Sequence, residues 1–164
     1  MAREASFAPV LELAEAVGWR AEQRAAGRSV VTTNGVFDLL HAGHVGYLAW
    51  ARAQGDVLLL LLNRDESVQL LGKGPGRPLV PFADRARVLS ALRSVDAIVG
   101  FAERTPDVAL DQLAPDVHVK SAQYRLEELP ERYVVERHGG RILLAPHEPG
   151  RSTTDLLARV RSRA

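Results

Sequence analysis

The 164-residue chain contains no cysteine, which excludes a disulfide framework, a thiolate nucleophile and any cysteine-ligated metal. It also lacks an excess of either charge. The formal net charge is +1, so nothing predicts binding to nucleic acid through overall charge. The longest aliphatic run, VLLLLL at residues 57–62, is too short to cross a bilayer and indicates a buried strand. The first residues carry acids where a signal peptide needs an apolar core. Together, these absences lead us to expect a cytoplasmic protein that binds neither membrane nor nucleic acid.

Several catalytic motifs are missing as well. No GxGxxG follows a strand pattern, and no GxSxG or HExxH occurs. GKGPGRP, at residues 72–78, has glycines and a lysine like a phosphate loop. However, it lacks the GxxxxGK[ST] spacing and leads into prolines instead of a helix. These absences count against a dinucleotide fingerprint, a P-loop enzyme and a serine hydrolase.

What the chain does contain is an alternation of apolar strand patterns with amphipathic helix patterns. Strands are predicted at residues 27–33, 56–63, 96–101, 116–120 and 141–146. Helices are predicted at residues 9–26, 43–55, 81–95, 105–115, 126–140 and 152–163. This alternation predicts an α/β fold, with one five-stranded parallel sheet and helices on both faces. We expect a helical extension at residues 1–27, whose apolar side chains could serve a homodimer, and a single domain at residues 28–164.

The loops after the strands are rich in groups that bind anions. In such folds ligands bind beyond the carboxyl ends of the strands, so these loops should meet at one edge. Helix N-termini at this edge would add N–H donors and a positive dipole end. The pattern predicts a polyphosphate site assembled from separate loops, with these residues: His41, His44, Lys73, Arg77, Lys120, Arg151, Ser152 and Thr153.

The pair of histidines is the most informative feature of these loops. If a helix begins near Ala42 or Gly43, His41 and His44 lie in its first turn and can donate to phosphate oxygens. One alternative is a structural pair, in which one imidazole caps the helix and the other is packed. Another is a zinc site that adds Asp38, although no glutamate stands between the histidines to act as a base. Nearby, we expect Arg85 to pair with Asp84 or Glu103.

GVFDLLHAGH, at residues 35–44, resembles the GxFDxxHxGH signature of the cytidylyltransferase-like nucleotidyltransferases. The similarity extends over about residues 25 to 162. The KGPGRP and PGRSTT blocks favour the ADP-heptose synthase branch of that family. The resemblance implies a Rossmann-like sheet and transfer of AMP from ATP, with Mg²⁺, to a sugar 1-phosphate with release of pyrophosphate.

The resemblance also implies roles for individual residues. His41 and His44 would hold the triphosphate and stabilise the transition state, with phosphate contacts from Lys73 and support from Arg77. Ser152 and Thr153 would bind the β- and γ-phosphates. Further positions follow from the same comparison: Gly35 and Phe37 for the nucleotide pocket, and Asp38, Asn63 and Asp65 for sugar contacts or loop ordering.

One block departs from the family pattern. The heptose branch usually carries KGGDY after the fourth predicted strand, whereas residues 120–124 read KSAQY. The loss of two glycines makes any positive φ there costly, and Gln123 replaces a charged aspartate. Gln123 and Tyr124 are therefore candidate acceptor-binding residues. A cytidylyltransferase for an alcohol phosphate such as glycerol 3-phosphate, or a nucleotide-binding module without turnover, stays open as an alternative.

Overall fold

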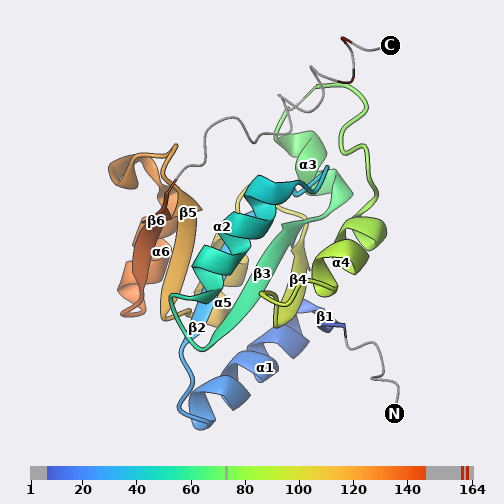
Figure 1. Ribbon diagram of the computed structural model, residues 1–164. Coiled ribbons are helices and arrows are strands. Elements are labelled where there is room, and N and C mark those ends of the chain that lie inside the picture. The colour runs from blue at the N-terminus through green and yellow to red at the C-terminus, as the bar shows by residue number, and fades with distance from the viewer. Residues whose placement is uncertain (1–6, 73, 147–159, 161, 163–164) are drawn as a thin grey trace, which may run out of the picture.

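The computed structural model describes residues 7–72, 74–146, 160 and 162 (Figure 1). Its strands are β1 (Val10–Leu11), β2 (Val30–Gly35), β3 (Val57–Asn63), β4 (Ala97–Phe101), β5 (Val117–Ser121) and β6 (Arg141–Ala145). Its helices are α1 (Leu13–Ala25), α2 (Ala42–Arg52), α3 (Asp65–Leu70), α4 (Phe82–Ser90), α5 (Asp107–Leu113) and α6 (Pro130–Arg137), with a short 3₁₀ turn at Leu126–Glu128. None of the described helices is long and apolar enough to cross a membrane.

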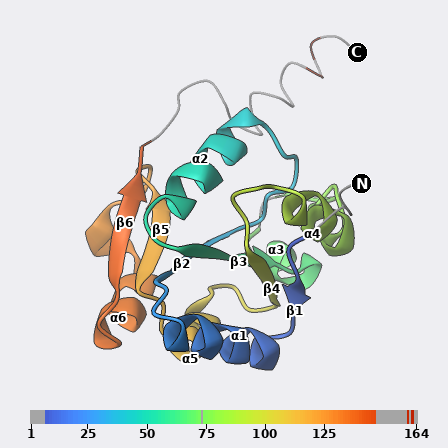
Figure 2. The ribbon, with the colours of Figure 1, turned by 60° about the horizontal axis from the view of Figure 1, so that its bottom comes forward.

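The strands form one parallel sheet in the order β1-β4-β3-β2-β5-β6, between two layers of helices (Figure 2). Strand β3 is buried along its whole length because alternate leucines serve opposite faces. Leu59 and Leu61 pack in one core with α1, α5 and α6, whereas Leu58 and Leu60 pack in the other with α2 and α4. The predicted α/β architecture with helices on both faces is confirmed.

The prediction of five strands is wrong, because the sheet has six. The predicted helix over residues 9–26 begins only at Leu13, and Val10–Leu11 pairs in parallel with β4. Glu12 is extended and forms a capping box with Glu15, so the helix cannot extend further back. Helix α1 packs Leu13, Ala16, Val17 and Trp19 against the core on one face of the sheet.

Two further helices differ from the prediction or lie beyond it. No helix is predicted between the strand that ends at residue 63 and the helix that begins at residue 81, yet α3 occupies part of this segment. Asp65 and Glu66 lie in its first turn, where acids interact favourably with the helix dipole. The predicted helix at residues 152–163 lies almost entirely outside the described residues.

Three aspartates hold the amino ends of the strands together. Asp56, Asp96 and Asp116 each precede a strand, and each accepts a hydrogen bond from a backbone N–H at the start of its neighbour. The N···O distances are 2.7 to 2.8 Å. The register is thereby fixed at the edge opposite the ligand loops.

The strand order also locates the expected ligand crevice. From β2 the chain proceeds to β3 and β4 on one side, and then returns to place β5 and β6 on the other side. The reversal lies between β2 and β5, and open parallel sheets bind ligands beyond the carboxyl ends of strands at such a point. We call this place the switch point. Asn34 and Gly35 end one of its strands, and Lys120 and Ser121 end the other.

Candidate functional site

The two histidines stack on each other at the start of α2. This helix begins at Ala42, one residue before its predicted start, with His41 as its extended N-cap and His44 in the first turn. The ring centroids of His41 and His44 are 3.8 Å apart, with an interplanar angle of 23°. The Phe37 ring packs against His44 at a centroid distance of 5.1 Å. Both imidazoles therefore lie at a helix N-terminus, next to N–H groups that have no partner within a helix.

The charge of this pair is limited by its surroundings. Burial lowers the pKa of the His41 imidazole below its ordinary value. Two imidazolium rings stacked at 3.8 Å would also repel each other. Within the described part of the chain, the buried Nδ1 of His41 has no hydrogen-bond partner. The pair is thus suited to hydrogen bonding with anionic oxygens more than to supplying two full charges.

Gly35 and Phe37 shape the wall beside the histidines. A Cβ atom at Gly35 would lie 2.7 Å from Cε2 of the Phe37 ring, which is closer than two non-bonded carbon atoms approach each other. Phe37 itself has a positive φ of 47°, which is uncommon for a residue with a side chain. The absent side chain at Gly35 therefore leaves room for Phe37, which in turn contacts His44.

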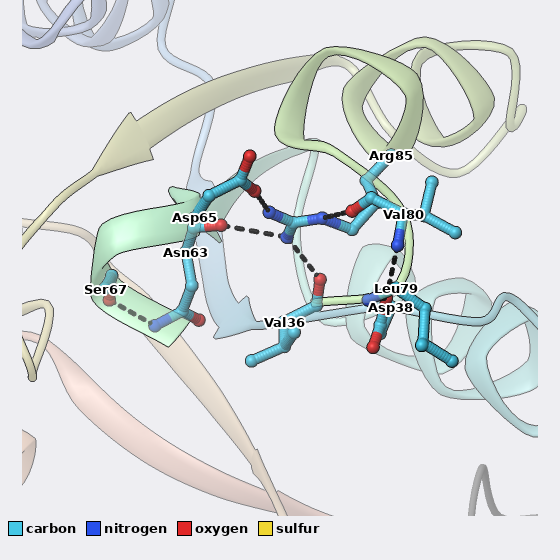
Figure 3. A network of polar contacts seen from close by, with 8 residues as sticks. All are labelled: Val36, Asp38, Asn63, Asp65, Ser67, Leu79, Val80 and Arg85. Carbon is cyan, nitrogen blue, oxygen red and sulfur yellow. Dashed lines mark hydrogen bonds and ion pairs between the residues drawn. The ribbon is translucent and has the colours of Figure 1, made fainter. Parts of the chain in front are cut away.

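Arg85 is the centre of a buried polar network at the ends of β2 and β3 (Figure 3). Its guanidinium donates to the carbonyl oxygens of Val36, Asn63 and Val80 at 2.7 to 2.8 Å, and it pairs with Asp65 at 2.6 Å. The expected pairing with Asp84 or Glu103 is wrong. The side chain of Arg85 is only 1% exposed. It extends from α4 to the loops that follow β2 and β3.

Asp38 ties the loop after β2 to the segment before α4. Its carboxylate accepts hydrogen bonds from the backbone N–H groups of Leu79 and Val80 and from Arg77, at 2.6 to 2.9 Å. Burial alone would raise the pKa of Asp38, but these hydrogen bonds and the Arg77 charge lower it overall. Asp38 therefore orders a loop, and both it and the Arg77 guanidinium already have partners within the protein. We call the contacts of Arg85 and Asp38 together the Arg85 network.

Asn63 and Asp65 lie next to the Arg85 network. Asn63 is buried and donates to the Ser67 hydroxyl at 2.9 Å, while one oxygen of Asp65 binds Arg85. An open cavity of about 550 Å³ lies beside α3 and is lined by Asp65, Gln69, Arg77 and neighbouring glycines and prolines. Of the three candidate sugar contacts, Asp38, Asn63 and Asp65, only Asp65 borders this cavity.

Lys120 joins the two strands of the switch point. Its Nζ donates to Oδ1 of Asn34 at 2.9 Å and to Oε1 of Glu131 at 2.8 Å, and both charged side chains are nearly buried. The Tyr124 ring lies 5.1 Å from the same ammonium. Gln123 and Tyr124 are exposed. Sequence reasoning missed Asn34 and Glu131 because neither belongs to a recognisable motif.

Four predicted site residues lie outside the described residues, so the structure does not locate them: Lys73, Arg151, Ser152 and Thr153. The other candidates surround the carboxyl edge of the sheet. Across the described ranges, no group of three or more His, Cys, Asp or Glu side chains is arranged to hold a metal ion. Asp38, the third ligand of the zinc alternative, uses both of its oxygens in the Arg85 network.

Comparison with known proteins gives matches over most of the chain. The cytidylyltransferase-like family profile matches residues 32–159. The D-beta-D-heptose 1-phosphate adenylyltransferase of Bordetella bronchiseptica is 48% identical over 134 residues, which cover 82% of this chain and 83% of that protein. The bifunctional protein HldE of Streptomyces coelicolor is 52% identical over 136 residues, which cover 83% of this chain. The chain spans only 29% of that longer relative.

Solved structures share the fold at low sequence identity. The lipopolysaccharide core biosynthesis protein from Thermoplasma volcanium has a TM-score of 0.62 and 24% identity, with coverage of 74% of this chain and 98% of that one. A pantoate-beta-alanine ligase from Francisella tularensis has a TM-score of 0.57 and 9% identity, with coverage of 88% and 69%. These likenesses concern the Rossmann-like fold alone.

Proposed function

Because the chain belongs to the cytidylyltransferase-like family, we propose that it transfers AMP from ATP to a heptose 1-phosphate or a similar sugar 1-phosphate. The observation that carries this proposal is the match to the Bordetella bronchiseptica adenylyltransferase, which covers most of both chains. The stacked His41–His44 pair at a helix N-terminus supports it, because that arrangement suits a polyphosphate ligand.

In the proposed reaction an oxygen of the sugar phosphate attacks the α-phosphorus of ATP. A new P–O bond forms, the bond from the α-phosphorus to the bridging oxygen breaks, and its electron pair leaves with pyrophosphate. No protein nucleophile is required, so catalysis consists of positioning the two substrates and stabilising negative charge. His41 and His44 are proposed to hydrogen-bond the phosphates as charge develops.

Other predicted residues take supporting roles in this proposal. Lys73, Arg151, Ser152 and Thr153 are proposed to bind phosphate oxygens, while Gly35 and Phe37 shape the nucleotide pocket. Asp65 borders the cavity beside α3, which is large enough for part of a sugar phosphate. Asp38, Asn63 and Arg77 are proposed to order the surrounding loops, consistent with their internal hydrogen bonds. Gln123 and Tyr124 are proposed to influence acceptor choice.

Magnesium enters this proposal as part of the MgATP substrate. Triphosphate oxygens are ligands that Mg²⁺ prefers, and it usually keeps several water molecules. We also propose a cytoplasmic location, a division of the chain at residue 27 and a homodimer. Light scattering of the purified chain tests the homodimer.

The direct test is pyrophosphate release from MgATP with a panel of acceptors. We expect pyrophosphate release when heptose 1-phosphate is present, and none when the acceptor is left out. Preference for CTP and glycerol 3-phosphate would instead support the cytidylyltransferase alternative. Nucleotide binding without pyrophosphate release from any acceptor would support a non-catalytic module.

A further inference from the structure

The buried ion pair between Lys120 and Glu131 is the feature of the switch point that phosphate binding does not explain. A lysine ammonium has three N–H donors, and here two of them are directed at Asn34 and Glu131. Only 10% of the Lys120 side chain and 6% of the Glu131 side chain are exposed. The second carboxylate oxygen, Oε2 of Glu131, is buried without a hydrogen-bond partner among the described residues.

Stability alone is a weak reason for this pair. Removing two charges from water is costly, and replacing a buried ion pair with apolar residues is often neutral or stabilising. A carboxylate with one unsatisfied buried oxygen makes the arrangement still less favourable. The pair nevertheless lies at the carboxyl ends of β2 and β5, where open parallel sheets bind their ligands.

The pair also changes what Lys120 can recognise. With Glu131 at 2.8 Å, the two charges cancel, so Lys120 adds little positive potential for a triphosphate. Among the described residues, the third N–H of the ammonium has no hydrogen-bond acceptor, although the Tyr124 ring lies 5.1 Å from the nitrogen. A neutral pair with a single fixed donor suits an uncharged oxygen, such as a sugar hydroxyl, better than a multiply charged phosphate.

Resting on the proposed adenylyl transfer, we propose that Glu131 is a positioning residue. It neutralises Lys120 and, with Asn34, directs the remaining N–H of that ammonium at a hydroxyl group of a bound substrate. The hydroxyl belongs either to the ribose of the nucleotide or to the acceptor sugar. In this arrangement Lys120 is a specificity contact, and the phosphates are held by other groups.

The lysine content of the chain allows a test that needs no activity. Lys73 and Lys120 are its two lysines, so ¹⁵N NMR of the side-chain ammonium groups gives two signals, which Lys73→Arg assigns. We expect the Lys120 signal to shift with adenosine or with mannose 1-phosphate, and the responding ligand identifies the source of the hydroxyl. It should not shift with inorganic tripolyphosphate or inorganic phosphate. A shift with tripolyphosphate alone, or no shift with any ligand, would overturn the proposal.

Variants separate positioning from a structural role. Glu131→Gln should raise KM about tenfold for the substrate that shifts the Lys120 signal, with kcat changed less than threefold and tripolyphosphate affinity not weakened. The double variant Lys120→Met with Glu131→Leu should keep the wild-type Tm and show the same KM defect. Glu136→Gln, which breaks an exposed pair on the same helix, is the matched control and should leave KM unchanged.

Two results would contradict this scheme. If the double variant kept the wild-type KM, the pair would have no role in substrate binding. If Lys120→Met alone weakened tripolyphosphate affinity tenfold, the ammonium would act as a free cation despite Glu131. Absence of pyrophosphate release from any acceptor would refute the proposed function, whereas the NMR titrations would still decide whether Lys120 contacts a hydroxyl.

Discussion

The two halves of the carboxyl edge of the sheet use buried charges in different ways. At the ends of β2 and β3, Arg85 and Asp38 bind mostly to backbone carbonyl and N–H groups. At the switch point between β2 and β5, the contacts of the Lys120 ammonium with other described residues are with side chains: hydrogen bonds to Asn34 and Glu131, and the Tyr124 ring 5.1 Å from its nitrogen. Arg85 and Asp38 hold loops in place, whereas the role proposed for Lys120 and Glu131 is to direct an N–H donor at a ligand.

The comparison leads to a general expectation. A buried charge that satisfies backbone groups cannot be removed without leaving those groups unpaired, so its loss affects folding. A buried ion pair near a crevice can be replaced as a whole by apolar residues with less damage to the fold, and so can a single imidazole that packs against other rings. Loss of these groups should therefore affect substrate binding or turnover. Substitutions in the two halves should therefore separate loss of stability from loss of activity.

The largest effect is expected for Arg85→Met. The change leaves the carbonyl oxygens of Val36, Asn63 and Val80 buried without their donor and removes the partner of Asp65. We expect the free energy of unfolding to fall by about 3–5 kcal/mol, measured by urea denaturation. Arg87→Met, at an exposed position on the same helix, should change it by less than about 1 kcal/mol. Equal effects of the two variants would show that the network does not stabilise the loops.

The second largest effect is expected for His44→Ala, and it should appear in turnover. Loss of one donor to developing negative charge lowers kcat by about 100-fold, equivalent to about 2.7 kcal/mol in transition-state stabilisation. The free energy of unfolding should change much less than in Arg85→Met. His41→Ala should behave similarly, since the two rings form one stacked unit. Wild-type turnover in either variant would remove the histidines from the proposed mechanism.

The sequence predicted the elements whose pattern is local. The apolar runs of β2 to β6 follow from periodicity, and α2 begins within one residue of its predicted start. Strand β1 was missed because two residues are too short to show a period, and it forms only by pairing with β4. Helix α3 was missed because the prolines and glycines that follow it made the whole segment resemble a loop.

The site was harder to predict because partners were not local. Arg77 and Lys120 were counted as available cations, yet Asp38 and Glu131, 39 and 11 residues away in the chain, already neutralise them. No spacing rule identifies such a pair, because it is brought together by strand order. The histidine pair could be foreseen because both members lie within one helical turn.

Asp38→Asn tests the first half of the comparison through pH, with a smaller effect. The folded-state pKa of Asp38 lies below its ordinary value of 3.8, so its contribution to stability is present above that value and is lost as the pH falls below it. We expect Asp38→Asn to lower the free energy of unfolding by about 2 kcal/mol at pH 7. The difference from wild type should shrink progressively below about pH 4. A difference that stays constant down to pH 2 would mean that the charge of Asp38 is not what stabilises the loop.

Gly35→Ala should give the smallest change in stability, and it links the two halves because β2 borders both. The new Cβ would lie 2.7 Å from the Phe37 ring, so the ring must move, and with it the contact to His44. We expect a loss of about 1 kcal/mol in stability and a fall of about threefold to tenfold in kcat. Gly18→Ala, in α1 where nothing lies within 4 Å of the new Cβ, should instead stabilise the protein slightly. Adding Phe37→Leu to Gly35→Ala relieves the clash. If turnover then recovers, Gly35 acts by leaving room for the ring, whereas a further loss would mean that the aromatic contact with His44 is itself required.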